Sequence, residues 1–425
     1  MSKNIFVVGL DEFNLVKLES LTLTADYKFH PLLRYEEIRG VESYTFQELL
    51  DKAERKLQAF EDSVDAIVGY FDFPISDMVP MLCRERGLTS ASLNSVVKCE
   101  HKYWSRLEQQ RSVPESIPRF NLFDPFDENP LDKIALAYPF WIKPIKSFRS
   151  FLGFKISNDQ QFYESVAIIR EKIESISEPF DDLLHYMNLP EEVASVIGRS
   201  CIAEEIISGR QCTLEGYVFQ GDVKIYGVID SLRYPNSSTF ASYQYPSTLP
   251  QHAQEEMMSI TERFVKHIGY DNAPFNVEFF YNEEQQKAWL LEINPRISQS
   301  HGDLFEKVDG MPNHKIMVDL ALGQKPEFPY RQGNYQYAAK FLERRFEDAL
   351  VVKVPSQADI EAVQEQIPDT LVDVFIKPGM RLSELANQDS YSYEVADILL
   401  GANSQEELLQ KHQQCFEQLP FEFAP

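Results

Sequence analysis

Two carboxylates in the chain stand in segments whose pattern places them face to face. Residues 276–280 and 289–296 each alternate apolar and polar side chains around a polar turn, which is typical of the two arms of a β-hairpin. A register centred on position 285 places Glu278 opposite Glu292 on the polar face. Because like charges directly opposite each other destabilise a pair of strands, we expect a cation to compensate them.

The same face of the hairpin carries further groups that bind ions. The register places Asn276 opposite Asn294, so two carboxylates and an amide oxygen gather there. These are the hard oxygen ligands that Mg²⁺ prefers, and the predicted ligands are Glu278, Glu292 and Asn294. Arg296 follows and could hold a carboxylate or phosphoryl oxygen in a bidentate fork. The simpler alternative is an exposed polar face of a sheet.

A basic segment is the second feature that could do chemistry. Residues 133–158 contain five Lys and Arg and no Asp or Glu, in a chain that is otherwise acidic. Their centre reads as a strand, a short loop and a second strand, and such a loop can surround a polyphosphate with ammonium and backbone N–H groups. The alternative is a solvated basic hairpin. The candidate phosphate ligands of the segment are Lys143, Lys146, Ser147, Arg149 and Ser150.

The elements that must position these residues change in type along the chain. A strand at 5–9, a helix at 46–60 and a strand at 64–70 predict an α/β layer with a parallel sheet, without the GxGxxG fingerprint of dinucleotide binding. From 138 to 296 longer strands and helices predict an α+β module, and a β-rich segment starts at about 331. The helices predicted after residue 100 are 102–111, 159–175, 181–197, 251–268 and 404–415.

The composition excludes several classes of partner. The 425 residues include 41 Lys and Arg against 66 Asp and Glu, a formal charge of −25. Such a chain neutralises few nucleic-acid phosphates and is repelled by an anionic membrane, so we expect neither partner. With 44% hydrophobic and 25% charged residues, it can build a sizeable core and is not of the disordered class.

The cysteines and the N-terminus predict a cytoplasmic protein. Five scattered Cys without a CxxC pair argue against a disulfide framework or a zinc site, and we expect reduced, mostly buried thiols. No apolar run approaches the about 18 residues that span a bilayer. The N-terminus leads directly into a strand without the apolar core of a signal peptide.

The basic strand–loop–strand, followed by Glu…Glu-x-Asn-x-Arg, resembles the ATP-grasp superfamily over roughly residues 100–325. The resemblance implies an ATP-grasp fold, of α/β and α+β class, in which two α+β subdomains hold ATP between them. From Leu342 onward the chain is similar to the C-terminal lobe of biotin-carboxylase-like members and L-amino-acid (dipeptide) ligases. The implied domains are an N-terminal α/β (pre-ATP-grasp) domain at 1–98, the ATP-grasp domain at 99–328 and a β-rich C-terminal lobe at 329–425.

The resemblance implies a role for each candidate residue. Lys102 and Lys143 look like the family's two phosphate-binding lysines, and residues 202–209 resemble the hinge strand that meets adenine. Gln211 stands where many members carry a ribose-binding acid. The implied ligands are, for ATP, Lys102, Lys143, Lys146, Ser147, Ser150, Glu204, Glu205, Ile207 and Gln211, and, for magnesium, Glu278, Glu292 and Asn294.

Two positions depart from the family pattern. The phosphate loop at 145–152 lacks the glycines usual there, which normally allow a close approach of the backbone. Closure of this lid could therefore differ, with Lys146 and Arg149 replacing some backbone contacts. Gln211 replaces an acid, although its amide can still accept a hydrogen bond from a hydroxyl.

The activity that the resemblance implies is that of a carboxylate–amine ligase using ATP with Mg²⁺, or alternatively Mn²⁺. A carboxylate would attack the γ-phosphate to give an acyl phosphate and ADP, an amine would then displace phosphate, and Arg296 would stabilise the developing charge. Arg233 is a candidate anchor for a substrate carboxylate, and His301 could be a polar contact or a proton acceptor. For both residues the alternative is a structural hydrogen bond. The alternatives are another ATP-grasp reaction, such as carboxylation or small-molecule phosphorylation, and a non-catalytic nucleotide-binding protein. The expected partners are small carboxylates and amines, and the flanking segments could supply a homodimer interface.

Overall fold

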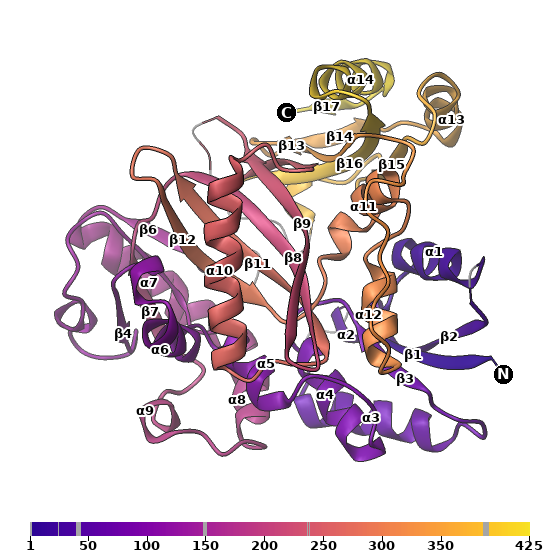
Figure 1. The fold of residues 1–425 in the computed structure, drawn as a ribbon. Helices are drawn as coiled ribbons and strands as arrows, with labels where there is room; N and C mark the ends of the chain where they lie inside the picture. The colour runs from indigo at the N-terminus through magenta and orange to yellow at the C-terminus, as the bar shows by residue number, and fades with distance from the viewer. Residues whose placement is uncertain are drawn as a thin grey trace.

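The computed structural model describes residues 2–23, 25–39, 44–147, 151–235, 237, 239–385 and 391–425. The strands of this part of the chain form sheets of three, four and eight strands and a two-stranded ribbon. Figure 1 shows the eight-stranded sheet in the middle of the molecule, the four-stranded sheet to its left and the N-terminal sheet at its lower right. No helix among the described residues has both the length and the apolarity needed to cross a membrane.

The N-terminal sheet is parallel, in the order β2-β1-β3. Its elements are β1 (Lys3–Leu10), β2 (Tyr27–Arg34), β3 (Ala66–Gly69), α1 (Glu12–Ser20), α2 (Tyr35–Arg39), α3 (Phe46–Gln58), α4 (Ile75–Arg86) and α12 (His314–Ala321). Apolar residues of α3 and α4 pack on one face of the sheet and those of α1 and α12 on the other. Because both faces are covered, the run of β1 is apolar almost throughout. The predicted parallel α/β layer is confirmed.

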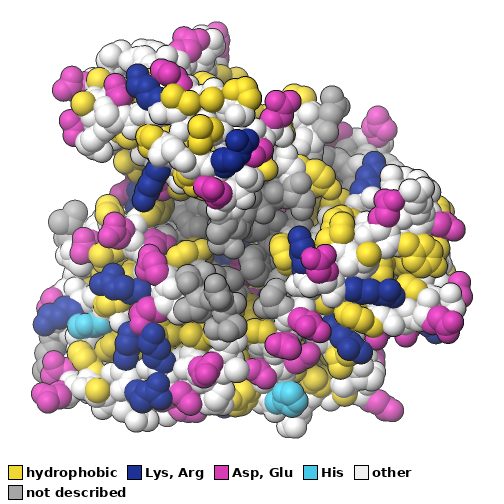
Figure 2. All heavy atoms as spheres, turned by 180° about the vertical axis from the view of Figure 1, so that it is seen from behind, with side chains coloured by type: hydrophobic (Ala, Val, Ile, Leu, Met, Phe, Trp, Pro, Cys, Tyr) yellow, Lys and Arg dark blue, Asp and Glu magenta, His cyan; other side chains and the backbone are white. Residues whose placement is uncertain are grey.

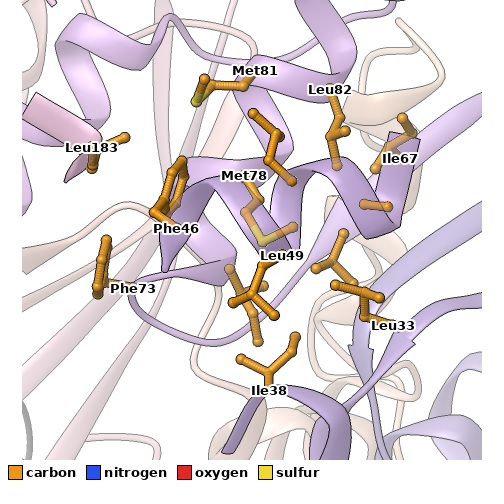
Figure 3. Close-up of a cluster of buried hydrophobic side chains, with 14 of the residues drawn as sticks. Leu33, Ile38, Phe46, Leu49, Ile67, Phe73, Met78, Met81, Leu82 and Leu183 are labelled. Atoms are coloured by element: carbon orange, nitrogen blue, oxygen red, sulfur yellow. The ribbon is translucent and has the colours of Figure 1, made fainter. Parts of the chain in front are cut away.

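The core beneath α3 and α4 extends beyond the N-terminal segment. Figure 3 shows Phe46 and Leu49 of α3 close to Met78 of α4, with Leu183 of α8 (Glu174–Leu184) at the edge of the same cluster. Leu183 belongs by sequence to the predicted α+β module. The module and the N-terminal sheet therefore share one core.

The four-stranded sheet is antiparallel, in the order β4-β7-β5-β6. Its elements are β4 (Phe120–Phe123), β5 (Phe140–Pro144), β6 (Phe154–Ile156), β7 (Cys201–Glu205) and α7 (Asp159–Lys172). Side chains alternate along β5, so Phe140 and Ile142 join the core under α7 while Trp141 and Lys143 line a cavity on the other face. The alternation along the strand thus places Lys143 in that cavity.

The eight-stranded sheet has the order β12-β11-β8-β9-β10-β13-β16-β15, and every neighbouring pair is antiparallel. The elements at its first end are β8 (Arg210–Phe219), β9 (Asp222–Arg233), β10 (Phe240–Tyr245), β11 (Ala273–Asn282), β12 (Lys287–Asn294), α10 (Gln251–His267) and α11 (Gly302–Asp309). Helix α10 covers the face formed by β8, β11 and β12, as Figure 1 shows. The opposite face of this end is left for the polar residues of the site.

The C-terminal segment continues the same sheet. Its elements are β13 (Tyr337–Arg345), β14 (Leu350–Lys353), β15 (Leu371–Val374), β16 (Tyr393–Ala402), β17 (Glu422–Ala424), α13 (Gln357–Gln366) and α14 (Gln405–Gln418). Strand β13 pairs with β10, so the sheet runs without interruption past the domain boundary that we placed after residue 328. Strands β14 and β17 form the two-stranded ribbon.

Most elements predicted from periodicity are confirmed within a few residues, including α6 (Lys102–Ser112), which follows α5 (Leu93–Glu100). The single helix predicted at 181–197 is wrong. Helix α8 ends at Leu184, and a separate short helix, α9 (Glu191–Ala194), starts after Pro190. Pro190 disfavours helical backbone at Leu189, so a single helix is not expected to run through this point, and α8 itself ends five residues before Leu189.

Candidate functional site

One cavity of about 830 Å³ lies where the N-terminal, four-stranded and eight-stranded sheets meet. Every candidate site residue that the structure describes lines this cavity. Two residues of the predicted phosphate loop, Arg149 and Ser150, lie outside the described part of the chain. Figure 2 shows that the molecule is hollowed on the face opposite to that of Figure 1, with acidic and basic side chains interspersed around the hollow.

The predicted hairpin is formed by β11 and β12. The predicted register is confirmed at the proposed magnesium ligands, because Glu278 pairs with Glu292 and Asn276 pairs with Asn294. A bulge between Glu278 and Phe279 shifts the pairing by one residue toward the turn. The single register that we predicted through the whole hairpin is therefore wrong beyond the bulge. A bulge of this kind re-aims side chains locally without breaking the strand pair.

The two opposed carboxylates differ in their surroundings. Burial, and then the charge of Glu292, raises the pKa of Glu278, against the opposing effect of Arg296. Burial acts on Glu292 in the same direction, but Lys102 and Lys143 outweigh it and lower the pKa of this carboxyl. One carboxylate of the pair is therefore compensated by lysines and the other is not.

The donor set around Glu278 fits a magnesium ion. Among the described residues Glu278 forms no ion pair, and it accepts hydrogen bonds from Gln211 Nε2 at 2.9 Å and Asn294 Nδ2 at 3.4 Å. The described residues contain no cluster of three or more His, Cys, Asp or Glu side chains that could hold a metal ion. Beside Glu278 and Glu292, a third protein ligand would therefore be an amide. The carboxylates of Glu278 and Glu292 are hard oxygen donors. Asn294 presents its NH2 group to Glu278 and Asn276, so its amide would have to turn for the oxygen to bind the ion.

Lys102 is the first residue of α6, and the loop at the end of β5 holds it in place. Its backbone N–H donates to Ile145 O at 2.9 Å, and His101 caps the helix by accepting from Trp104 N at 3.2 Å. The Lys102 ammonium lies 2.5 Å from Glu292 Oε1. The helix start thus brings the first predicted phosphate lysine to the carboxylate hairpin.

Lys143 belongs to a buried cluster of opposite charges. Its ammonium lies 2.7 Å from Glu204 Oε2, and Arg106 Nε lies 2.5 Å from Glu204 Oε1. Burial opposes ionisation of Glu204, but Arg106 and then Lys143 hold its pKa at about 2. Burial also lowers the pKa of Lys143, against the attraction of Glu204. The predicted adenine-facing acid therefore carries a full charge that two cations balance.

Lys146 turns toward the N-terminal sheet. It is buried, forms an ion pair with Glu100 of α5, and lies 5.2 Å and 5.4 Å from the ring centres of Phe73 and Phe180. Burial raises the pKa of neighbouring Asp77 to about 7, against the effect of the Lys146 charge. The ammonium is held by the protein, and a contact to phosphate stays a prediction.

The remaining predicted nucleotide residues lie along one wall of the cavity. Ser147 and Ile207 line it, and Glu205 forms an exposed ion pair with Arg119 at 2.7 Å. Gln211 is buried, and the same side chain that donates to Glu278 accepts from the guanidinium of Arg233. Its role at the ribose stays a prediction.

Arg233 is enclosed by aromatic rings. Its guanidinium lies 5.3 Å from the ring centre of Phe240 and 5.2 Å from that of Phe280, and Nε donates to Gln211 Oε1 at 2.9 Å. Burial lowers its pKa. Arg233 is attracted by Glu278 but contacts only rings and a neutral amide here, so its guanidinium can still bind a substrate anion.

Arg296 reaches across the cavity to the N-terminal sheet. Its Nε and Nη2 lie 2.8 Å and 3.1 Å from the two carboxylate oxygens of Asp72, a bidentate pair. Burial disfavours the charged guanidinium, but Asp72 outweighs this effect and raises the pKa of Arg296. The predicted arginine therefore lies in a fork with a carboxylate, which shows that its geometry suits such a ligand.

The sequence analysis missed four residues of this network, Asp72, Glu100, Arg106 and Glu215. Asp72 stands three residues after the end of β3, and the carboxyl end of a parallel strand is where such sites form. Arg106 stands four residues after Lys102, on the same face of α6. Glu215 shares a face of β8 with Gln211. It lies 2.9 Å from Nδ1 of buried His301. The positions of Asp72, Arg106 and Glu215 in the sequence could therefore have indicated that they belong to the site, whereas no sequence pattern indicated Glu100.

Comparisons with known proteins agree with this geometry. Residues 136–302 match the family model of the ATP-grasp domain. The carbamoyl phosphate synthase large chain, C-terminal section, of Methanopyrus kandleri is 29% identical over 150 residues, or 34% of this chain and 27% of that protein. The carbamoyl phosphate synthase large chain of Thermoanaerobacter sp. is 25% identical over 166 residues, or 38% and 15%. The chain thus spans about a quarter or less of these relatives.

Solved structures match over the full length. An L-amino acid ligase from Bacillus licheniformis superposes with a TM-score of 0.77 at 15% identity, covering 100% of this chain and 99% of that one. A biotin carboxylase from Campylobacter jejuni, solved as a β,γ-ATP complex, superposes with a TM-score of 0.65 at 14% identity, covering 100% and 92%. At these identities the likeness establishes the fold, including both flanking segments.

Proposed function

We propose, from the premise that the chain carries an ATP-grasp domain at residues 136–302, that it is an ATP- and Mg²⁺-dependent carboxylate–amine ligase. One observation carries the proposal. One cavity of about 830 Å³ is lined by groups from segments far apart in sequence: the opposed carboxylates Glu278 and Glu292, Lys102, Lys143 and Arg296. That volume is in the range of small-molecule sites. The full-length likeness to an L-amino acid ligase supports the same activity.

The chain's own residues would act mainly by positioning and charge. Phosphoryl transfer asks little covalent chemistry of the protein, so placing the phosphates against the attacking carboxylate is the main task. Lys102 and Lys143, now paired with Glu292 and Glu204, would share their protons with phosphate oxygens. A bound Mg²⁺ would neutralise charge on those oxygens. Arg296 would exchange its carboxylate partner for an oxygen of the transferred group.

We propose α-amino acids as the substrate class. An amino acid offers a carboxylate and an ammonium group, and the cavity presents the matching charges in Arg296 and Asp72, 2.8 Å apart. Arg233 provides a second cation for the carboxylate that is not activated. The free, buried cysteines and the demand for ATP agree with a cytoplasmic enzyme. A homodimer stays a prediction.

The decisive experiment is a screen for ADP and phosphate release. The protein is incubated with ATP, Mg²⁺ and the twenty L-amino acids, singly and in pairs, together with small carboxylic acids. Release of both products only with a pair, and a new amide in the mass spectrum, is the expected result. ADP without phosphate from one acceptor would identify a kinase. No turnover with any pair, with Glu292→Gln leaving ATP binding unchanged, would exclude an enzyme.

A further inference from the structure

The buried carboxylate of Glu215 fixes which ring nitrogen of His301 carries a proton. His301 is the single histidine among the described residues that line the cavity. Glu215 is fully buried, and four donors surround it: Asn276 Nδ2 at 2.7 Å, Tyr226 OH at 3.0 Å, Ser298 N at 3.1 Å and His301 Nδ1 at 2.9 Å. An ionised carboxylate only accepts hydrogen bonds, so the proton of His301 must lie on Nδ1. In the neutral ring, Nε2 then carries a lone pair.

The other nitrogen of His301 is left for a ligand. No hydrogen bond to Nε2 is recorded within the described chain, and His301 lines the same cavity as Arg296. The imidazole is held from a second side by the ring of Tyr243, with centres 5.2 Å apart and planes at 76°. Glu215 and Tyr243 thus fix the orientation of the His301 ring, and Nε2 remains available to accept a proton.

The proposed reaction needs such a group in its second half. An amino acid at neutral pH presents an ammonium group, which has no lone pair for attack on an acyl phosphate. The other candidate bases are assigned to other groups: Glu292 is paired with Lys102, and Asp72, which pairs with Arg296 in the structure, is proposed above to hold the ammonium group of the activated amino acid. A neutral imidazole with an unused Nε2 is suited to take the proton.

We propose that His301 is the base that deprotonates the amine nucleophile, and that Glu215 is a positioning residue that holds its tautomer; this rests on the proposed function. The ammonium gives one proton to Nε2, and the amine lone pair forms the C–N bond at the acyl carbon. The C–O bond to phosphate breaks and phosphate leaves with that electron pair. The second amine proton goes to the departing phosphate, so amide and hydrogen phosphate result.

The test uses two nucleophiles that differ in their need for a base. Hydroxylamine is largely unprotonated at neutral pH, whereas glycine is an ammonium. In the His301→Asn variant the amide nitrogen can occupy the place of Nδ1 and keep the contact to Glu215, while Nε2 is removed. We expect kcat for coupling to glycine to fall by about 10²–10³ with KM little changed, and hydroxamate formation to stay within about threefold.

Two further variants separate positioning from packing. Glu215→Gln should shift the ratio of hydroxamate to amide in the same direction as His301→Asn, because the acceptor that fixes the tautomer is weakened. Tyr226→Phe removes a different donor to Glu215, at 3.0 Å, and should leave that ratio unchanged. Each protein is first compared with the wild type by its thermal unfolding midpoint.

The outcomes distinguish this inference from the proposed function. A wild-type protein that releases no ADP with any amino acid, with or without hydroxylamine, refutes the proposed function and this inference together. A wild-type protein that couples amines while His301→Asn does so equally well overturns this inference alone. Equal losses with both nucleophiles also overturn it, because they indicate a structural role. Selective loss of amide formation supports it.

Discussion

The two sheets that face each other across the cavity differ in how their carboxylates are partnered. On the four-stranded sheet, Glu204 is enclosed by Arg106 and Lys143, and its pKa is held at about 2. On the eight-stranded sheet, burial and a neighbouring carboxylate raise the pKa of Glu278, which contacts amides. On one wall the carboxylate lies in contact with two cations, whereas Glu278 on the other wall accepts hydrogen bonds from amides and is attracted by Arg296 and Arg233 without an ion pair to either.

The difference distinguishes residues that stabilise the fold around the cleft, such as Glu204, from residues that are available to bind a ligand, such as Glu278. A buried charge with matched partners stabilises one arrangement of the chain, and removing a partner is costly. A partly buried carboxylate that has no cation in contact, such as Glu278, is unfavourable in its charged form and is stabilised when a cation binds. We therefore expect substitutions on the two walls to affect different measurements.

The largest expected effect is on stability, from Glu204→Gln. The change leaves Arg106 and Lys143 buried beside a neutral amide, and the free energy of unfolding should fall by roughly 3–5 kcal/mol. The measurement is urea unfolding without nucleotide. The matched control is Glu205→Gln on the same strand, whose partner Arg119 has a 68% exposed side chain. Equal losses from both variants would mean that the four-stranded wall is not held by its charges.

Glu278→Gln should affect turnover and spare stability. Loss of a metal ligand should lower ATP turnover by on the order of 10²–10³. The free energy of unfolding should change by no more than about 1 kcal/mol, because a repulsion between opposed carboxylates is lost with the charge. Turnover is measured over a Mg²⁺ titration, and unfolding without metal. A large loss of stability with intact turnover would reverse the assignment of the two walls.

The pH dependence of stability should have opposite signs on the two walls. Glu204 has a lowered pKa, so its contribution is present above about pH 4.5 and is lost as the pH falls toward about 2. Glu278 has a raised pKa, so its contribution is present below about pH 4.5 and is lost as the pH rises through that raised value. Unfolding curves of the wild type and both Gln variants across this range measure the two slopes. Parallel curves for all three proteins would contradict the comparison.

The smallest expected effect is that of Arg119→Ala. The pair with Glu205 is exposed to solvent, so its loss should cost less than about 1 kcal/mol of unfolding free energy. Salt should remove even that difference, because exposed charges are screened. Urea unfolding at low and high ionic strength tests both statements. A larger, salt-independent loss would show that the pair contributes as a buried one does.

Local patterns predicted the parts of the site that depend on one element or one turn. The opposition of Glu278 and Glu292 followed from period-two alternation, and the strand that carries Lys143 from the same rule. The bulge in β12 was not predicted, because no residue type marks it. The separate helix α9 was missed although Pro190 was a signal in the sequence.

Contacts between distant segments were beyond such reasoning. Arg106 and Glu204 are separated by 98 residues, and Arg296 and Asp72 by 224. Each side chain alone reads as an ordinary surface charge. Their pairing depends on how α6, β7 and the end of β3 pack around the hairpin, which no periodicity encodes.

The sequence by itself determined which residues share a face, because backbone geometry fixes the alternation of a strand and the turn of a helix. It thereby determined the carboxylate hairpin, the basic strand and the class of fold. Only the tertiary structure decided which carboxylates are balanced by cations and which nitrogen of His301 is left for a ligand. The reason is physical: the charge state of a buried group is set by its burial and by the few partners that packing brings within hydrogen-bond distance.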